Sequence, residues 1–293
     1  MKKKAKSFYQ LGVFMIAIGN EFVAARINAL GAELASLRDA SGHEYVWQAG
    51  PAWPRHSPVL FPIVGQVNND TLRVDGREYH MGRHGFARDR EFTPGSVTAD
   101  HASFVLADDD ATRAVYPFAF RLTLEYRVTG AALRVRYLVE NPGPGPLPFS
   151  LGAHPAFNWP LPKQAQQLVF DRAEPAPVRR LADGLLAPEG IPTPIQGRTL
   201  PLSDELFVAD ALILDQVASR GVAFGKLRLT WCEEMRQLGI WSKPGADFLC
   251  IEPWAGHSDP VGYAGEFRDK PAVVLLPPAA QAAFWWEVAV KDH

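Results

Sequence analysis

The chain has 293 residues, of which 47% are hydrophobic and 21% are charged. This length and balance allow a full hydrophobic core, in one large domain or two ordinary ones. The formal net charge is only -2, and no basic stripe stands out beyond the first residues. We therefore expect no nucleic-acid partner.

A lysine-rich start, residues 2–6, precedes a mostly apolar stretch, residues 8–18. The order superficially resembles a secretory signal, but no small-residue cleavage site follows, and the stretch is too short to span a bilayer. We therefore expect no membrane association. The sequence predicts a disordered leader or an early start codon at residues 1–14 and a single domain over residues 15–293.

Two cysteines, Cys232 and Cys250, each lie in an apolar, strand-like run and form no C-x-x-C motif. This pattern predicts buried free thiols, which suit a reducing compartment. We therefore expect a cytoplasmic protein.

Strand signals dominate the chain. Across residues 121–140, apolar side chains alternate with polar ones on both sides of Gly130, which predicts a β-hairpin with one buried face. A second hairpin is predicted over residues 72–81, turning at Asp75 and Gly76. Further strand-like runs cover residues 22–27, 103–106, 168–170, 227–231, 238–241, 248–251, 272–276 and 284–290.

Helical signals are weak by comparison. No segment keeps a helical apolar period, and the best candidate is a single turn at residues 203–207 with Ser203 as its cap. We interpret the Pro/Gly-dense residues 141–148 as a loop within the domain and residues 175–198 as the longest irregular stretch. Together these features predict an antiparallel all-β fold.

Glu252 has an unusual setting, because it directly follows an apolar run and stands before Pro253 and Trp254. A buried carboxylate costs free energy unless it is paired or used. His84 and His154 have similar settings, each expected at a strand-to-loop junction beside aromatic residues. Two imidazoles and a carboxylate of this kind indicate acid–base chemistry on a neutral substrate with an apolar face, such as a sugar.

The residues after His154 add candidate binding groups. Pro155 favours an extended conformation at His154. Asn158 offers a donor and an acceptor to hydroxyl groups, and Trp159 offers a ring that can stack on a pyranose.

Structural roles remain open for each of these residues. Either histidine can be a surface or satisfied core residue, and Glu252 can pair with an arginine. A metal site is a further alternative, although the stretch with His80 and His84 is not helical and His56 is only nearby in sequence.

Glycosidase chemistry also stays open, because it needs a second carboxylic acid beside the first. Asp210, Asp259 or Glu266 could supply that acid. No G-x-S-x-G, Walker or G-x-G-x-x-G motif is present.

Several short segments resemble the aldose 1-epimerase (mutarotase) family, in particular its LacX-like branch. The clearest read SPVLFPIVG, HGFARD, HPAFN and IEPW, at residues 57–65, 84–89, 154–158 and 251–254. Shorter matches lie at residues 18–22 and 31–34. The resemblance covers residues 15–290, and its motifs are specific jointly rather than singly.

The resemblance implies a galactose mutarotase-like β-supersandwich of antiparallel sheets with an open cleft on one face. It carries the family's acid onto His154 and the family's base onto Glu252. A second histidine, which contacts the ring oxygen of the sugar, corresponds to His84, and a substrate-binding aspartate corresponds to Asp210.

One position departs from the family pattern. After the Phe-Pro-x-x-Gly segment, many relatives carry an arginine that binds sugar hydroxyls, whereas this chain has Gln66. Gln66 is itself a candidate substrate-binding residue, and Arg55 or Arg83 could replace the missing arginine. The departure therefore bears on the substrate more than on the chemistry.

The resemblance implies aldose 1-epimerase activity on a hexose, without cofactor or metal. Ionised Glu252 would take the proton of the anomeric hydroxyl, and protonated His154 would donate to the ring oxygen. The reference pKa values of about 4.3 for Glu and about 6.5 for His allow these starting states. They also predict a bell-shaped pH dependence, with Glu252 setting the acidic limb and His154 the basic limb.

Other functions on the same fold are a hexose-6-phosphate mutarotase and a non-catalytic carbohydrate-binding protein. The first needs an anion pocket, for which Arg55, Arg83, Arg88 and Lys163 are candidates. In each case we expect a small-molecule sugar as the partner and a monomer or homodimer.

Overall fold

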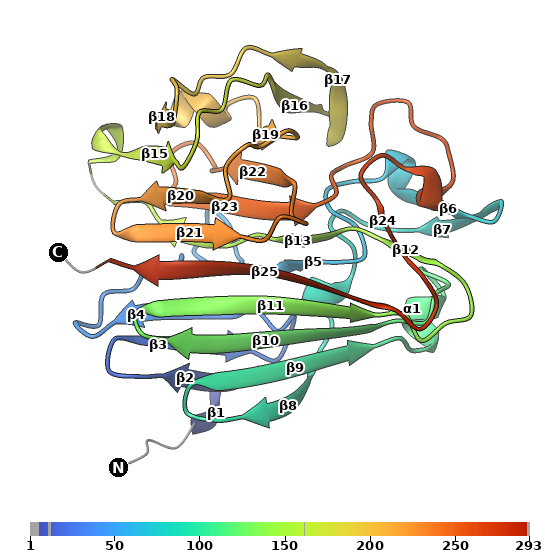
Figure 1. Ribbon diagram of the computed structural model, residues 1–293, viewed down its shortest axis with the longest axis horizontal. Coiled ribbons are helices and arrows are strands. Elements are labelled where there is room, and N and C mark those ends of the chain that lie inside the picture. The colour runs from blue at the N-terminus through green and yellow to red at the C-terminus, as the bar shows by residue number, and fades with distance from the viewer. Residues whose placement is uncertain (1–5, 11–12, 161, 292–293) are drawn as a thin grey trace.

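The computed structural model describes residues 6–10, 13–160 and 162–291. The described residues form an antiparallel all-β fold, as the sequence predicts (Figure 1). Two large sheets dominate, and three small ones pack around them.

Helices are few within the described part of the chain. They are one short α-helix, α1 (Asp110–Arg113), and the 3₁₀ turns η1 (Asn68–Asp70), η2 (Ala87–Asp89), η3 (Lys163–Ala165), η4 (Asp204–Phe207) and η5 (Phe267–Asp269). Ser203 precedes η4 as expected, but its side chain makes no capping hydrogen bond. None of these described helices has the length and apolar character needed to cross a membrane.

The largest sheet has nine strands in the order β18-β15-β20-β21-β25-β11-β10-β9-β8 (Figure 1). The strands are β8 (Thr93–Val97), β9 (His101–Ala107), β10 (Arg121–Thr129), β11 (Ala132–Glu140), β15 (Gln167–Phe170), β18 (Thr199–Pro201), β20 (Gly221–Phe224), β21 (Leu227–Trp231) and β25 (Gln281–Val290). β10 and β11 confirm the predicted hairpin.

The second large sheet has eight strands, in the order β17-β16-β19-β22-β23-β13-β5 with β14 paired to β23. Its strands are β5 (Val59–Leu60), β13 (Leu151–Ala153), β14 (Ala156–Asn158), β16 (Val178–Ala182), β17 (Leu185–Ile191), β19 (Leu212–Leu214), β22 (Gln237–Trp241) and β23 (Phe248–Ala255). The β16–β17 hairpin lies within residues 175–198, which we expected to be irregular. Few of its side chains are buried, so it lacks the alternating pattern that identifies a strand.

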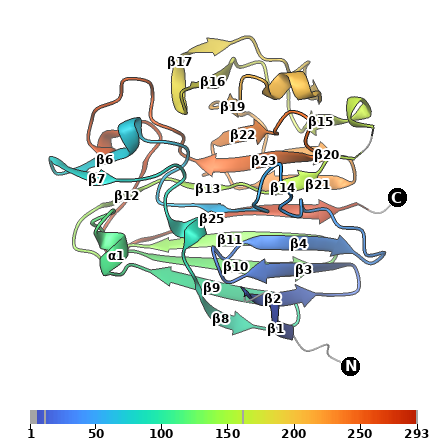
Figure 2. The same cartoon turned by 180° about the vertical axis from the view of Figure 1, so that it is seen from behind.

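The small sheets surround this framework. β1 (Lys6–Gln10), β2 (Val13–Gly19), β3 (Val23–Asn28) and β4 (Leu34–Asp39) form a four-stranded sheet that packs against β9, β10 and β11 (Figure 2). β6 (Thr71–Val74) and β7 (Arg77–His80) form the second predicted hairpin, and β12 (Leu147–Phe149) pairs with β24 (Val274–Leu276).

The strand β1 corrects one expectation. It falls within residues 1–14, which we expected to be a disordered leader, yet it pairs with β2 from Lys6↔Ala17 to Gln10↔Val13. An edge strand needs only the free backbone groups of its neighbour, so it can form without an apolar pattern. Residues 1–5 and 11–12 lie outside the described residues.

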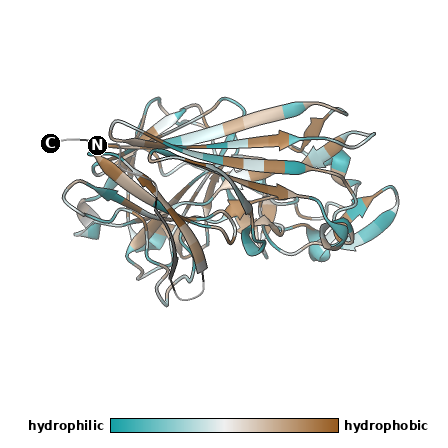
Figure 3. Cartoon of the chain, turned by 90° about the horizontal axis from the view of Figure 1, so that it is seen from below, coloured by the Kyte–Doolittle hydropathy of each residue, from teal (hydrophilic) through white to brown (hydrophobic). Residues whose placement is uncertain are grey.

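The main core forms because strand side chains alternate between two faces. On β10, Leu122, Leu124, Tyr126 and Val128 are buried, while the intervening residues are more exposed. Figure 3 shows this alternation of hydrophilic and hydrophobic residues along the long strands.

Strand β23 behaves differently, because all its residues are buried. Leu249 and Ile251 point into the main core, whereas Cys250 and Trp254 belong to separate clusters on the opposite face of the sheet. Glu252 shares that opposite face, since it is two residues from each of them.

Candidate active site

A cleft of about 230 Å³ opens on this opposite face of the eight-stranded sheet. Aromatic, titratable and cationic side chains line it together with aliphatic and small residues. The lining residues are Trp53, Val64, Gly65, Arg83, His84, Arg88, His154, Leu181, Gly184, Asp210, Ala211, Ile213, Trp241, Glu252, Trp254 and Ser258. The structure thus brings together the sequence-predicted residues His84, His154, Asp210 and Glu252.

His154 and Glu252 face each other across neighbouring strands. β13 pairs with β23 through Gly152↔Trp254, and continuing this register by two residues places His154 opposite Glu252. The His154 Nε2 and Glu252 Oε2 atoms are 3.2 Å apart. Both residues are almost fully buried, with exposed fractions of 7% and 1%.

Two glycines make room for the indole of Trp254 beside this pair. A Cβ atom on Gly152 would lie 2.6 Å from Trp254 Cδ1. Gly239 on β22 pairs with Glu252 on β23. A Cβ atom on Gly239 would lie 2.3 Å from the same ring. The ring therefore lies against the sheet surface next to Glu252, and larger side chains at either glycine would displace it.

His84 lies in a tight turn with φ of 67°, and Gly85 follows with φ of 70°. A Cβ atom on Gly85 would lie 2.3 Å from the Phe61 carbonyl oxygen, so the turn requires glycine. The Gly65 N–H donates to His84 Nδ1 at 3.1 Å. Because Nδ1 accepts this bond, the ring is neutral and carries its proton on Nε2. Its centroid is 5.5 Å from that of His154.

Asp210 enters the cleft from the loop before β19. Its backbone has φ of 64°, and its Oδ1 atom accepts the N–H of Ala211 at 2.8 Å. Arg180 donates to the Asp210 carbonyl oxygen at 2.7 Å. These contacts fix the loop that holds the Asp210 carboxylate beside the cleft.

Burial dominates the electrostatics of the His154–Glu252 pair. Burial raises the pKa of Glu252 well above its ordinary value, and the negative charge of Asp210 raises it further. Burial also lowers the pKa of His154, and nearby arginines lower it too. Burial therefore favours the neutral forms of both groups over an ion pair between them. This corrects the expectation, drawn from reference values, of an ionised Glu252 beside a protonated His154.

Four buried polar atoms of the cleft residues make no hydrogen bond within the described part of the chain. They are Glu252 Oε2, His154 Nδ1, Trp254 Nε1 and Arg88 Nε. Buried polar groups normally have partners, and those without one call for a functional explanation. Glu252 Oε2 and Trp254 Nε1 therefore have unused hydrogen-bonding capacity at the cleft.

Tryptophans form the apolar walls of the cleft. The ring of Trp53 stacks on His154 with centroids 5.0 Å apart, and Trp241 meets His154 edge-on at 6.1 Å. These rings exclude water from the pair and so deepen its desolvation. Neither tryptophan was predicted as a site residue. One signal could have identified Trp53. It lies in a Pro-Ala-Trp-Pro segment, where no strand pattern explains the presence of a large aromatic ring.

Arginines surround one side of the cleft. Arg83 and Arg88 line it, and Arg88 donates to the Arg83 carbonyl oxygen at 2.7 Å. Burial, and then the charge of Arg55, lower the pKa of Arg88. The nearby carboxylate of Asp89 lies 2.8 Å from Arg55 and 3.6 Å from Arg88. Positive charge is therefore in excess on this side.

Gln66 and Arg55 do not line the cleft, although both were predicted to bind substrate. Gln66 donates to Asp70 at 3.1 Å and accepts from Arg83 at 3.2 Å. It therefore helps to position Arg83, which lines the cleft. Arg55 is held by Asp89 and acts on the histidines only through its charge.

Asn158 and Trp159 were also predicted to bind the sugar, but they do not line this cleft. They line a different cavity, of about 460 Å³. Asn158 donates to the Glu44 carbonyl oxygen at 2.9 Å, and Trp159 is 3% exposed. The reason is the strand register: β14 pairs Asn158 with Phe248, so the chain runs away from Glu252 after His154.

The other residues left open by the sequence lie elsewhere. His80 is exposed on β7, and His56, His80 and His84 form no common metal site in the described structure. The remaining candidates, His56, Lys163, Asp259 and Glu266, each form an ion pair with another residue. The pairs are His56–Glu33, Lys163–Asp247, Asp259–Lys270 and Glu266–Arg268. A second carboxylate beside Glu252 could therefore come only from Asp210 among the three acids considered.

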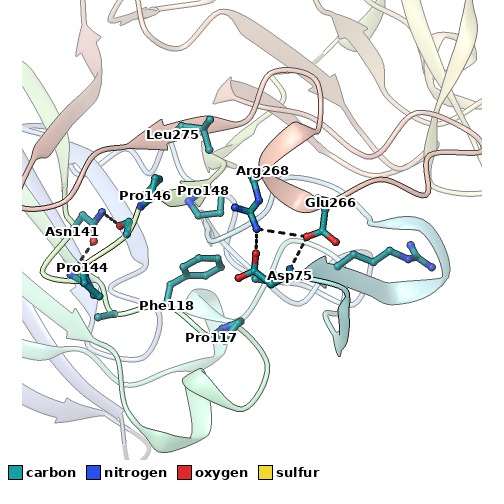
Figure 4. A pocket seen from close by; sticks show the side chains of 15 residues that line it. Asp75, Pro117, Phe118, Asn141, Pro144, Pro146, Pro148, Glu266, Arg268 and Leu275 are labelled. Atoms are coloured by element: carbon teal, nitrogen blue, oxygen red, sulfur yellow. Dashed lines mark hydrogen bonds and ion pairs between the residues drawn. The ribbon is translucent and has the colours of Figure 1, made fainter.

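A larger cavity, of about 470 Å³, lies elsewhere on the molecule (Figure 4). Its charged groups neutralise one another, because Arg268 pairs with Asp75 and Glu266. Phe118 and several prolines supply apolar walls, and no histidine or cysteine is among the described residues that line it. Of these two cavities, only the smaller cleft is lined by imidazole side chains, which are suited to proton transfer.

Comparisons with known proteins agree with this architecture. A family model described as aldose 1-epimerase matches residues 15–273. The chromosomal protein LacX of Lactococcus lactis subsp. lactis is 32% identical over 298 residues, covering 94% of this chain and 99% of that protein.

Two solved structures are similar as well. A galactose mutarotase related enzyme from Lactobacillus acidophilus has a TM-score of 0.86 at 31% identity, with 94% of this chain and 97% of that chain covered. A galactose mutarotase-like protein from Lactobacillus casei ATCC 334 has a TM-score of 0.86 at 29% identity, with 94% and 100% covered. The fold is therefore galactose mutarotase-like.

Proposed function

Because the chain belongs to the aldose 1-epimerase family, we propose that it interconverts the α and β anomers of a hexose through the buried His154–Glu252 pair. The observation that carries this proposal is the 3.2 Å contact between His154 Nε2 and Glu252 Oε2 in a cleft lined by tryptophans. Ring opening needs such a pair, because one sugar oxygen loses a proton while the other gains one.

In the proposed reaction, Glu252 takes the proton from the anomeric hydroxyl and His154 gives a proton to the ring oxygen. The bond between C1 and the ring oxygen breaks, its electron pair stays on that oxygen, and C1 becomes an aldehyde. Rotation about the C1–C2 bond exposes the other carbonyl face, and the reverse transfers close the ring. The enzyme gains no net proton over the cycle.

The neighbours of the pair would prepare it for this reaction. In the free protein, burial favours placing the single proton on Glu252. Hydrogen bonds from substrate hydroxyls would stabilise the carboxylate and shift the proton to His154. The Nε2–H group of His84 would donate to the ring oxygen, and Asp210 would accept from a hydroxyl.

Anomer exchange, followed by polarimetry and NMR over a panel of free and 6-phosphorylated aldoses, tests the proposal. The expected result is acceleration for at least one sugar, lost in Glu252→Gln. Binding of a sugar without acceleration of any would instead identify a carbohydrate-binding protein.

A phosphorylated hexose is the second candidate substrate, and the excess positive charge from Arg83 and Arg88 supports it. Charge-assisted hydrogen bonds to phosphate contribute about 1.5–3 kcal/mol each. Arg83→Gln should therefore lower kcat/KM for a hexose 6-phosphate at least about 10-fold more than for the free hexose. Arg73→Gln, which removes an arginine paired with Glu78 outside the cleft, is the matched control. Equal losses for both substrates would reject the phosphate.

The remaining expectations stay predictions. Both cysteines are buried free thiols, as predicted, and this supports a cytoplasmic location. A monomeric or homodimeric state and a single domain are part of the same proposal, with the domain extended before residue 15 by the pairing of β1 with β2. Size-exclusion chromatography with limited proteolysis would test both.

A further inference from the structure

A thiol lies beside the acid–base pair and takes no part in the proposed reaction. Cys250 Sγ, a ring nitrogen of His154 and a carboxylate oxygen of Glu252 all lie within 4.8 Å of one another. The sheet explains this arrangement. Cys250 precedes Glu252 by two residues on the same face of β23, and Ala156, two residues after His154, pairs with Cys250.

This cluster is enclosed on one side and open on the other. Cys250 is fully buried in a small apolar cluster, whereas His154 and Glu252 line the cleft. The buried Glu252 Oε2 atom makes no hydrogen bond within the described structure, so it has a lone pair to donate. An ion held by these residues would keep one coordination position towards the cleft, where water can bind.

A thiolate, an imidazole and a carboxylate form a donor set for Zn²⁺ and similar ions rather than for Mg²⁺ or Ca²⁺. Two ligands at about 2.0–2.1 Å from a tetrahedral ion lie about 3.3 Å apart. The 3.2 Å separation of His154 Nε2 and Glu252 Oε2 agrees with this spacing. We propose that Cys250, His154 and Glu252 bind one zinc-class divalent ion, which competes with the sugar for the cleft.

Binding exchanges protons for the metal ion. The Cys250 thiol releases its proton to solvent, and the His154–Glu252 pair releases the proton that it holds, so that all three groups donate lone pairs. The occupied pair then has no proton to give and no free base. Ring opening therefore stops while the ion is bound and resumes when a chelator removes it.

Titration of Co²⁺ into the full chain, in the absence of any sugar, tests the binding directly. We expect one ion per chain with a thiolate-to-cobalt charge-transfer band, which Zn²⁺ displaces and Mg²⁺ leaves unchanged. Cys250→Ala should abolish the band and weaken binding at least about 10-fold, since loss of even an outer-shell partner costs that much. Cys250→Ser, which keeps the side-chain size, repeats the test if the alanine variant does not fold.

Cys232→Ala is the matched control, because Cys232 is also buried but accepts the Trp285 N–H at 3.3 Å outside the cluster. It should keep the band. In anomer exchange, Zn²⁺ should raise the apparent KM of the unaltered chain and of Cys232→Ala but not that of Cys250→Ala. A wild-type chain without the band, or a Cys250→Ala variant that retains it, would overturn the proposal. The spectroscopic result does not depend on any enzymatic activity, so it is distinguishable from failure of the proposed function.

Discussion

Strands β11 and β23 lie in the two large sheets and bury their side chains in different ways. On β11, buried Leu133, Val135 and Tyr137 alternate with more exposed residues. On β23 every residue is buried, one face towards the main core and the other towards the cleft. The first pattern is that of a strand with one solvent-facing side, and the second that of a strand covered on both sides.

The charged residues of the two regions show what this difference means. Arg136 on β11 pairs with Glu125 on β10 at 2.7 Å, with both side chains partly exposed to solvent. Glu252 on β23 lies 3.2 Å from His154, its one partner at ion-pair distance among the described residues, and burial raises its pKa. A solvated ion pair contributes little to stability and nothing to reactivity. A desolvated pair has shifted pKa values, which are typical of groups that exchange protons with a substrate.

The largest expected effect comes from Glu252→Gln, which removes the basic lone pair but keeps the side-chain shape. Turnover should fall by about 10²–10⁴-fold, the usual contribution of a positioned proton transfer. Anomer exchange measured by NMR gives the rate, and urea unfolding checks that the fold persists. Near-parental turnover in a stable variant would remove Glu252 from the mechanism.

The matched change in the other sheet is Glu125→Gln. It breaks the pair with Arg136 on a partly exposed surface. Because such pairs contribute about 0–1 kcal/mol, both the free energy of unfolding and the turnover should change little. A comparable loss of activity in this variant would show that the Glu252 effect does not depend on the cleft.

The next effect concerns the packing that supports the cleft. Gly239→Ala should place a Cβ atom 2.3 Å from the Trp254 ring, and overpacking of this kind typically costs about 1–3 kcal/mol. Turnover should fall as well, since Trp254 lies beside Glu252. Gly82→Ala is the control, because a Cβ atom there meets nothing within 4 Å. The urea midpoints of the two variants give the comparison, and equal midpoints would contradict the assigned packing.

Glu252 could be singled out from the sequence because it directly follows an apolar run. A carboxylate in such a run conflicts with the burial of its neighbours, and this local conflict signals a functional site. The β10–β11 hairpin was predictable for the opposite reason, since its pattern is regular throughout.

The rest of the site depends on contacts between distant segments. Trp53 contacts His154 from a loop, and no periodic pattern in the sequence indicates that the two side chains meet. Asn158 and Trp159 follow His154 closely in sequence, but the register of β14 with β23 carries them away from Glu252. The directions of the two pKa shifts also escaped prediction, because reference pKa values omit the desolvation that three-dimensional burial imposes.

The pH dependence sharpens this last point. Activity should be bell-shaped, but with both limbs set by the pair. The acidic limb marks uptake of a second proton and lies below the ordinary His value of about 6.5, because burial lowers the pKa of His154. The basic limb marks loss of the only proton and lies well above the ordinary Glu value of about 4.3, because burial raises the pKa of Glu252.

Stability should follow the same shifts. The folded pKa of Glu252 is above its unfolded value, so the stabilising contribution of the protonated form is complete below about pH 4.3 and is lost as pH rises through the folded pKa. Glu252→Gln should therefore gain stability relative to the parent chain as pH increases from 4 to 8, while Glu125→Gln should not. Urea midpoints at several pH values measure this trend, and a constant difference would argue against a raised Glu252 pKa.

The smallest expected effect is at the start of the chain, far from the cleft. A chain that begins at Val13 loses the edge ladder between β1 and β2, and we expect its free energy of unfolding to change by less than about 1 kcal/mol. A chain beginning at Met15 also loses Phe14, which packs against the main core and accepts the Ala29 N–H at 2.9 Å. The second truncation should cost about 1–2 kcal/mol more, from the lost apolar contact and the unpaired N–H group.

Both chains should keep the parental kcat/KM, because neither change touches the eight-stranded sheet. Loss of activity in the first truncation at unchanged stability would mean that residues 1–12 contribute to the site itself.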